Sequence, residues 1–319
     1  MSGFGITKKA MGCPVRSSMD VVEVDSKGLG HKLFMDRNAH DADGILLINR
    51  IKSHTDFHGP HESGLVKMSV IGVGKERQAS EMHQFGVHGL RDLVPKAAER
   101  LFATGKFLAG LAIVENGYEQ TAVLELVPAK EIMKRETELL DLARRNMPRL
   151  PVEDLDLLIV ERLGKEISGS GMDTNIIGRI RIPGEAEPKS PRIKSIVVDR
   201  LTKESHGNAT GMGLADVTTR AFFDSIDFKV TNKNIITSAF LERGKMPIVA
   251  ESAREAVEFA LRSCGPRPKQ GWRIIRIRDT LHLDQLYIST VIADELRGRK
   301  GIEIDSKPAE LFDRRGSLT

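Results

Sequence analysis

Histidines and one lysine gather in a short stretch of the chain, residues 49–75. His54, His58 and His61 fall within eight residues, and Lys67 follows them among apolar neighbours. Histidine both accepts and donates a proton near neutral pH, and its neutral imidazole binds transition metals. The stretch therefore predicts acid/base chemistry, a metal site, or both.

The apolar setting of Lys67 leaves two interpretations open. The side chain is either an edge residue that reaches solvent or a desolvated amine, whose lowered pKa would make it a nucleophile able to carry a covalent adduct. His58, His61 and His88 are more typical of surface loops.

The elements around this stretch predict where it lies. Residues 44–49 form a short continuous apolar run, typical of a strand buried on both faces of a parallel sheet. Ligands of open α/β sheets bind beyond the carboxyl ends of such strands, and His54 follows there. Apolar runs and helix-forming segments then alternate, with runs at 68–73 and 107–114 and helices at 76–88 and 91–104. An α/β layer is expected.

The clearest helix, residues 128–146, ends before a proline-containing connector, and a domain boundary is expected near residue 150. The second half repeats the pattern, with strands at 155–160, 193–198 and 273–277, helices near 213–226, 251–263 and 289–297, an exposed loop at 178–192 and a loose polar tail at 304–319. The sequence thus predicts a two-domain α/β protein, domains 1–150 and 151–319. Its sheets are parallel or mixed and flanked by helices, and the active site is expected in the interdomain cleft.

Two glycine-rich segments in the second half, 164–175 and 205–216, each follow a predicted strand. Closely spaced glycines let a backbone approach a ligand and present N–H groups to an anion, although structural turns explain the glycines equally well. Lys165 is the candidate partner for a substrate carboxylate, and His206 is a further substrate-binding candidate.

Composition narrows the class of protein. The 319 residues are 40% hydrophobic and 29% charged, with a net charge of +4 and both signs interspersed. This pattern does not suggest nucleic-acid binding and supports at most a preference for small anions. Cys13 and Cys264 lack the paired spacing of a zinc site, and we expect reduced thiols in a soluble, cytoplasmic protein. No apolar run approaches the roughly 18 residues of a membrane span.

Three blocks of the sequence resemble a known family. They are Ile51-Lys-Ser-His-Thr-Asp-Phe-x-Gly-Pro-x-Glu-Ser-Gly-Leu-x-Lys-Met68, Gly164-Lys-x-Ile-Ser-Gly-x-Gly-Met-Asp173 and His206-Gly-Asn-Ala-Thr-Gly211. These blocks look like the nickel-dependent lactate racemases, and more closely like the racemase-like branch that acts on other 2-hydroxy acids. The resemblance implies that residues 1–150 are the C-terminal part of the cofactor-binding N-terminal domain. Residues 151–319 would be the C-terminal domain.

The resemblance also implies a cofactor, a nickel pincer nucleotide made by dedicated biosynthesis proteins. Lys67 matches the lysine that carries the nucleotide through a thioamide, His83 matches the histidine that completes the nickel coordination, and His54 matches a catalytic histidine. The implied reaction is racemisation or epimerisation of a lactate-like 2-hydroxy acid by hydride transfer, with acid/base groups on opposite faces of the substrate.

Members of that branch carry about a hundred further residues, including a second catalytic histidine, before the point matched by the start of this chain. We therefore expect a chain that lacks the N-terminal portion of the family. Two alternatives stay open: a catalytically incompetent member that retains cofactor or partner binding, and a metal-dependent hydrolase built on the histidine cluster.

Overall fold

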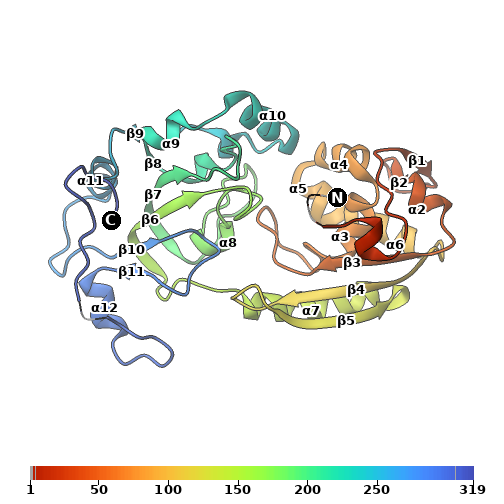
Figure 1. Ribbon diagram of the computed structural model, residues 1–319, viewed down its shortest axis with the longest axis horizontal. Coiled ribbons are helices and arrows are strands. Elements are labelled where there is room, and N and C mark those ends of the chain that lie inside the picture. The colour runs from red at the N-terminus through yellow and green to blue at the C-terminus, as the bar shows by residue number, and fades with distance from the viewer. Residues whose placement is uncertain (1–2, 4, 306) are drawn as a thin grey trace. The chain divides into compact units, whose positions relative to one another are not determined.

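The computed structural model describes residues 3, 5–305 and 307–319 of the chain (Figure 1). The chain divides into two compact units, residues 1–146 and 147–319. This division falls close to the expected boundary at residue 150. Both units combine helices with parallel or mixed sheets, so the predicted α/β fold class is confirmed.

Unit 1 contains a hairpin and a three-stranded mixed sheet. Its strands are β1 (Val21–Val24), β2 (Leu33–Asp36), β3 (Ile45–Arg50), β4 (Phe107–Glu115) and β5 (Thr121–Pro128). The sheet order is β3-β4-β5, with β3 parallel and β5 antiparallel to the central strand β4. The helical elements of unit 1 are α1 (Lys8–Met11), α2 (Arg37–Asp41), α3 (Leu65–Lys67), the π-helical turn η2 (Met68–Gly72), α4 (Lys75–His83), α5 (Gly86–His88), the π-helical turn η3 (Gly89–Leu93), α6 (Val94–Phe102), the 3₁₀ turn η4 (Ala129–Glu131) and α7 (Ile132–Asn146).

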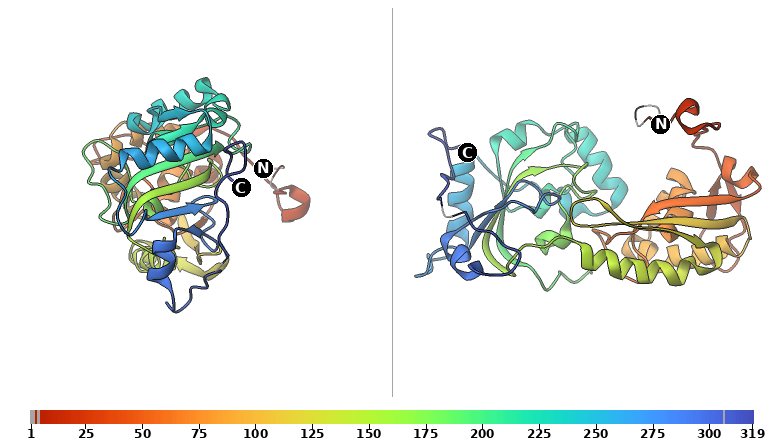
Figure 2. Two further views of the ribbon diagram at one scale, coloured as in Figure 1. Left: turned by 90° about the vertical axis from the view of Figure 1, so that its left-hand side faces the viewer. Right: turned by 60° about the horizontal axis from the view of Figure 1, so that its bottom comes forward.

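The expected burial of β3 on both faces is wrong. Ile45 and Leu47 are buried, but Leu46 and Ile48, on the alternate positions, are 55% and 57% exposed. Leu124 on β5 is exposed on the same sheet. Successive side chains of a strand point to opposite faces, and only one face of this sheet packs against α3 and α7 (Figure 2). An apolar run therefore indicated a strand but not how many of its faces are covered.

The second apolar run, residues 68–73, is helical and is not a strand. It forms the π-helical turn η2 between α3 and α4, with Ser69 and Val70 buried. Periodicity alone does not separate a short buried strand from a buried helical turn, and here the run is too short to show a helical repeat.

Unit 2 is a doubly covered sheet. Its strands are β6 (Asp154–Leu163), β7 (Arg192–Leu201), β8 (Val217–Thr219), β9 (Ile248–Ala250), β10 (Ile274–Ile277) and β11 (Tyr287–Ile288), in the spatial order β11-β10-β6-β7-β8-β9. All neighbours are parallel except the β10–β11 pair. The helical elements are α8 (Thr174–Ile177), η5 (Met212–Leu214), α9 (Arg220–Asp224), α10 (Phe228–Ser238), η6 (Leu241–Gly244), α11 (Ala253–Ser263) and α12 (Thr290–Leu296).

Alternate residues of β6 enter different cores. Leu158 and Val160 join the cluster that includes Phe222 of α9 and Ile292 of α12. Leu157 and Ile159 join the cluster under α11. Six consecutive residues of β6 are buried, as expected for a central parallel strand.

Two expectations for unit 2 need correction. The helix expected over 213–226 is interrupted by strand β8, which separates the 3₁₀ turn η5 from the short α-helix α9 at residues 220–224. The tail expected to be loose, residues 304–319, packs Leu311, Phe312 and Leu318 against the core under α11. Three apolar residues spaced among charges gave too little signal in the sequence to predict that contact. Among the described residues, no helix combines the length and the apolar character needed to cross a membrane.

Candidate active site

The loop between β3 and α3 carries His54 and leads directly to the helix that bears Lys67, the other predicted catalytic residue of unit 1. It is closed at its base by a two-way backbone bridge, in which Lys52 N–H donates to Ser63 O at 2.9 Å and Ser63 N–H donates to Lys52 O at 3.2 Å. Ile51 and Phe57 anchor it in the core, 1% and 2% exposed. The loop therefore leaves a strand end and returns to the start of the helix that bears Lys67.

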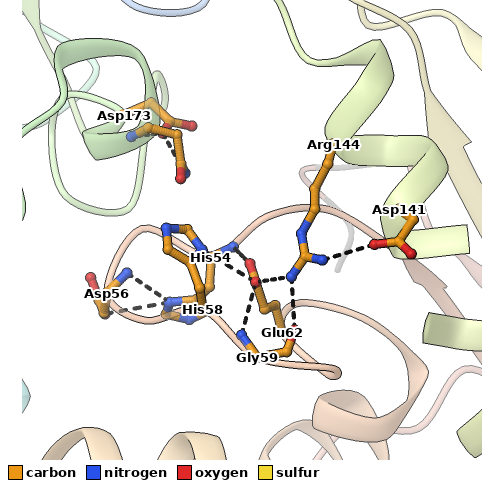
Figure 3. A network of polar contacts seen from close by, with 9 residues as sticks. His54, Asp56, His58, Gly59, Glu62, Asp141, Arg144 and Asp173 are labelled. Atoms are coloured by element: carbon orange, nitrogen blue, oxygen red, sulfur yellow. Dashed lines mark hydrogen bonds and ion pairs between the residues drawn. The ribbon is translucent and has the colours of Figure 1, made fainter. Parts of the chain in front are cut away.

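Glu62 holds this loop together from inside (Figure 3). Its buried carboxylate accepts hydrogen bonds from the backbone N–H of His54 at 2.5 Å and of Gly59 at 3.2 Å. His58 Nδ1 at 3.2 Å and Arg144 Nη2 of α7 at 2.6 Å complete the set. Burial alone would raise the pKa of Glu62, but these hydrogen bonds outweigh it and hold the pKa below its usual 4.5. The carboxylate is therefore charged at neutral pH.

A second buried carboxylate, Glu136 of α7, fixes the start of α3. Its Oε2 accepts from Val66 N–H at 2.9 Å, and its Oε1 lies 3.2 Å from His61 Nδ1. A side chain at Gly64 would collide with this carboxylate, since a Cβ there would lie 2.4 Å from Oε2. Glycine at position 64 thus lets the carboxylate reach the backbone next to Lys67.

His54 and Lys67 are in direct contact. His54 Nε2 lies 2.5 Å from Lys67 Nζ, while Nδ1 of the same ring accepts the backbone N–H of Asp56 at 3.0 Å. A neutral imidazole that accepts at Nδ1 carries its hydrogen on Nε2. The amine must then accept that hydrogen with a lone pair, because an ammonium group has none. The ring is also held by stacking on Phe57, with centroids 4.5 Å apart.

Electrostatics agree with a neutral amine. Burial lowers the pKa of Lys67, partly opposed by the negative charge of Asp56 and assisted by Lys52. The lysine is the last residue of α3 and directly precedes the π-helical turn η2. Single π-helical turns are frequent at functional sites. The desolvated-amine interpretation of Lys67 is therefore the one that the geometry supports.

His83 ends α4 with a partnerless nitrogen. Its Nδ1 is buried and has no hydrogen-bond partner among the described residues. Burial, followed by the positive charge that Lys67 would carry when protonated, lowers the pKa of His83, whereas Asp56 raises it. The imidazole is therefore neutral near pH 7, which is the form that binds a metal. A buried polar atom without a partner is costly and calls for a ligand.

The other histidines of the cluster have structural contacts. His61 is buried against Glu136, so its expected surface position is wrong. His58 is half-exposed and contacts Glu62, and His88 is exposed and pairs with Asp92 at 2.8 Å. Glu62 and Glu136 were not predicted as functional residues, because an acidic residue in a helix or loop usually lies in solvent.

In unit 2 the two predicted substrate-binding residues follow adjacent parallel strands. Lys165 comes directly after β6, where its N–H donates to Ser205 Oγ at 2.9 Å and its Nζ contacts Asn234 Oδ1 of α10 at 3.2 Å. Ser205 precedes His206 in the loop after β7. His206 itself is exposed, with φ of 48°. The structure thus brings the two glycine-rich loops together at one sheet edge. Asn234, absent from the sequence prediction, also contributes there.

No group of three or more His, Cys, Asp or Glu side chains in the described part of the chain is placed to hold a metal ion. Family models were compared with the sequence and none matches. No curated protein matches either.

Among solved structures, one similar chain is a crystal structure of a Thermotoga maritima protein from a structural genomics consortium. It shares 14% identity with a TM-score of 0.38 over 53% of this chain. The aligned region spans 42% of that protein's length.

Proposed function

We propose that the chain is a racemase or epimerase of a small, lactate-like 2-hydroxy carboxylic acid, using a nickel pincer nucleotide attached to Lys67. The observation that carries this proposal is the 2.5 Å contact of His54 Nε2 with the Lys67 amine. The resemblance of the three sequence blocks to nickel-dependent racemases supports the same assignment.

The residues of unit 1 fit such a cofactor. An amine with a lone pair is the form of lysine that can be acylated, and partial burial, which lowers the pKa of Lys67, favours this form. In the family that the sequence blocks resemble, one protein imidazole completes the nickel coordination. His83 would supply it, since its Nδ1 is buried and has no hydrogen-bond partner in the part of the chain that the structure describes. When bound, the cofactor supplies a hydride acceptor for the substrate carbon C2.

His54 is placed for proton transfer with the substrate 2-hydroxyl. Its Nε2 points to Lys67. Its other ring nitrogen, Nδ1, faces Asp56: the backbone N–H of Asp56 donates to it, and the Asp56 carboxylate oxygen Oδ2 lies 3.7 Å away. To take a proton at Nε2, the ring has to move its hydrogen from Nε2 to Nδ1 and release the Asp56 N–H. The Asp56 carboxylate, 3.7 Å from Nδ1, has to move closer to accept that hydrogen. The same carboxylate then stabilises the imidazolium that forms.

The attachment of the cofactor is tested by intact-mass spectrometry of the chain produced together with the cofactor biosynthesis proteins. We expect a heavy adduct on the unaltered protein and none on Lys67→Ala. Lys52→Ala, which removes an exposed lysine at the base of the same loop, should keep the adduct. An adduct on Lys67→Ala, or its absence from the unaltered protein, would contradict the proposal.

The nickel ligand is tested by elemental analysis of the same preparations. His83→Ala should lose nickel while the organic part of the cofactor stays on Lys67, because the imidazole contributes to metal binding and not to the thioamide. His88→Ala is the matched control, since that histidine lies on the surface five residues further on. Equal nickel in His83→Ala and in the unaltered protein would remove the assignment.

A further inference from the structure

His282 lies outside the histidine cluster of unit 1 and follows strand β10 of unit 2. The order of this sheet is β11-β10-β6-β7-β8-β9, so the chain proceeds from β6 to β9 on one side and returns to the other side of β6 with β10. The gap between β6 and β10 is thus the point where the winding reverses. In open α/β sheets, ligands bind at the carboxyl ends of the two strands that flank such a point.

Asp279 and His282 lie at that place, just past the carboxyl end of β10. The side chain of Asp279 is 3% exposed, and one of its oxygens accepts the backbone N–H groups of Leu281 at 2.9 Å and His282 at 3.0 Å. Both oxygens also lie within hydrogen-bond distance of His282 Nδ1, at 2.8 and 2.9 Å. The buried carboxylate therefore fixes both the loop and the ring.

The contact defines the state of the imidazole. A carboxylate only accepts hydrogen bonds, so His282 carries a hydrogen on Nδ1. In the neutral ring Nε2 then has a lone pair, and the side chain is 44% exposed. The result is an oriented hydrogen-bond acceptor at an open position, which is how a carboxylate prepares a histidine for acid/base work.

This pair differs from the surface histidine–carboxylate pairs of unit 1. In the His40–Asp41 pair, both side chains are exposed, at 45% and 63%, and they make a single contact of 3.0 Å. In contrast, Asp279 is buried and makes four contacts to its own loop. Holding a carboxylate inside the protein is costly unless hydrogen bonds compensate, so the arrangement of Asp279 is specific rather than incidental.

The loops after β6 and β10, on the two sides of the gap, are joined by a hydrogen bond. Thr280, next to Asp279, accepts the backbone N–H of Asp173 at the end of the glycine-rich loop, at 2.9 Å. That loop begins at Gly164, and Lys165 is its second residue. The loops after β6 and β10 are therefore joined, and Lys165 and His282 belong to loops at the same edge of the sheet.

We propose that this edge of unit 2 is a binding site for a small 2-hydroxy carboxylate, in which His282 Nε2 accepts a hydrogen bond from the ligand hydroxyl. Asp279 is a positioning residue that keeps the ring hydrogen on Nδ1 and orients Nε2. We assign the ligand carboxylate to Lys165, whose ammonium now contacts Gly169 O and Asn234 Oδ1 and would have to give up a contact to bind the ligand. The ligand class rests on the proposed function, but the site itself does not require the cofactor.

The test uses the full chain produced without the cofactor biosynthesis proteins, so cofactor attachment does not affect the outcome. Affinities for lactate and for propionate, which lacks the 2-hydroxyl, are measured by NMR titration. We expect the unaltered protein to prefer lactate about tenfold, the upper range for one hydrogen bond. His282→Ala should bind propionate as before and lose the preference for lactate. His40→Ala, from the exposed pair, should behave as the unaltered protein.

A second readout follows the imidazole directly. Nitrogen NMR of the unaltered protein should show the hydrogen of His282 on Nδ1, and lactate should shift the Nε2 signal. Asp279→Asn should mix the two tautomers and weaken lactate binding while propionate binding stays unchanged. A preference for lactate that survives in His282→Ala, or no lactate binding by the unaltered protein, overturns the proposal. Failure of the adduct on Lys67 would instead count only against the nickel chemistry.

Discussion

Glu62 shows how one side chain sets the conditions for its neighbours. Its carboxylate forms hydrogen bonds with the backbone N–H of His54, with the ring of His58 and with the guanidinium of Arg144. The position of His54 therefore depends on a charged side chain that takes no part in the proposed reaction. The hydrogen bonds hold the pKa of Glu62 below its usual 4.5 despite burial. A group whose folded pKa is lowered contributes stability above its unfolded pKa and loses it as the pH falls through the folded value.

We expect Glu62→Gln to be less stable than the unaltered protein by about 2 kcal/mol at pH 7, because an amide cannot accept all four donors and leaves some of them unpaired. The difference should stay constant down to about pH 4.5 and shrink as the pH falls further. Urea unfolding across this pH range measures it. A difference that grows toward low pH would show that Glu62 is protonated in the folded protein.

At the scale of residues, the sequence predicted candidate reacting residues but not the side chains that support them. His54 and Lys67 belong to an unusual combination of histidines and an apolar-flanked lysine, whereas the role predicted for His83 is what the resemblance to nickel-dependent racemases implies. Glu136 looked like any solvent-facing charge of an amphipathic helix, and its burial depends on Gly64, which lies far from it in sequence. Pairing of that kind is a property of the fold, and composition does not encode it.

Between residues and units, the elements that position Lys67 are short and closely packed. Helix α3 has three residues and continues into a π-helical turn, so its geometry comes from tertiary contacts and not from its own helix propensity. The sequence predicted the long helix α7 and strand β4, both of which have clear periodicity. The turn at 68–72 was misassigned because a short, mostly apolar run fits either kind of element.

The close approach of α7 to α3 gives a test. Gly64→Ala would place a methyl group 2.4 Å from the Glu136 carboxylate, so we expect a loss of about 1–3 kcal/mol, the usual cost of overpacking. Gly169→Ala is the control, because no atom lies within 4 Å of its added Cβ. Equal stabilities of the two variants in urea unfolding would mean that Glu136 does not occupy the space beside Gly64.

Strand β3 offers a matched pair of neighbouring residues. Leu47 is 4% exposed and Ile48 is 57% exposed, although both are large aliphatic side chains. We expect Leu47→Ala to cost about 2–5 kcal/mol and Ile48→Ala less than about 1 kcal/mol. Circular dichroism during denaturant unfolding compares them. Similar costs for both would show that the outer face of the sheet is covered in solution.

Across the whole molecule, the sequence predicted two α/β units and placed their division close to where it falls. It treated the two sheets as alike, yet the described side chains differ. β6 of unit 2 is buried on both faces, while β3 of unit 1 alternates between buried and exposed residues. Both strands are rich in Leu, Ile and Val, so the difference depends on how many helical layers pack on each sheet, which a single strand's sequence does not reveal.

The closed loop before α3 has a consequence for how the protein opens. Loops usually exchange their amide hydrogens with solvent quickly, because few backbone groups there are bonded. Here the N–H groups of His54, Gly59 and Val66 donate to buried carboxylates. Across the loop base, the N–H groups of Lys52 and Ser63 each donate to the backbone oxygen of the other residue. These amides should exchange at rates typical of core strands and should quicken together when Glu62 is replaced. The loop that bears the histidines would then open with the core of unit 1 and not ahead of it.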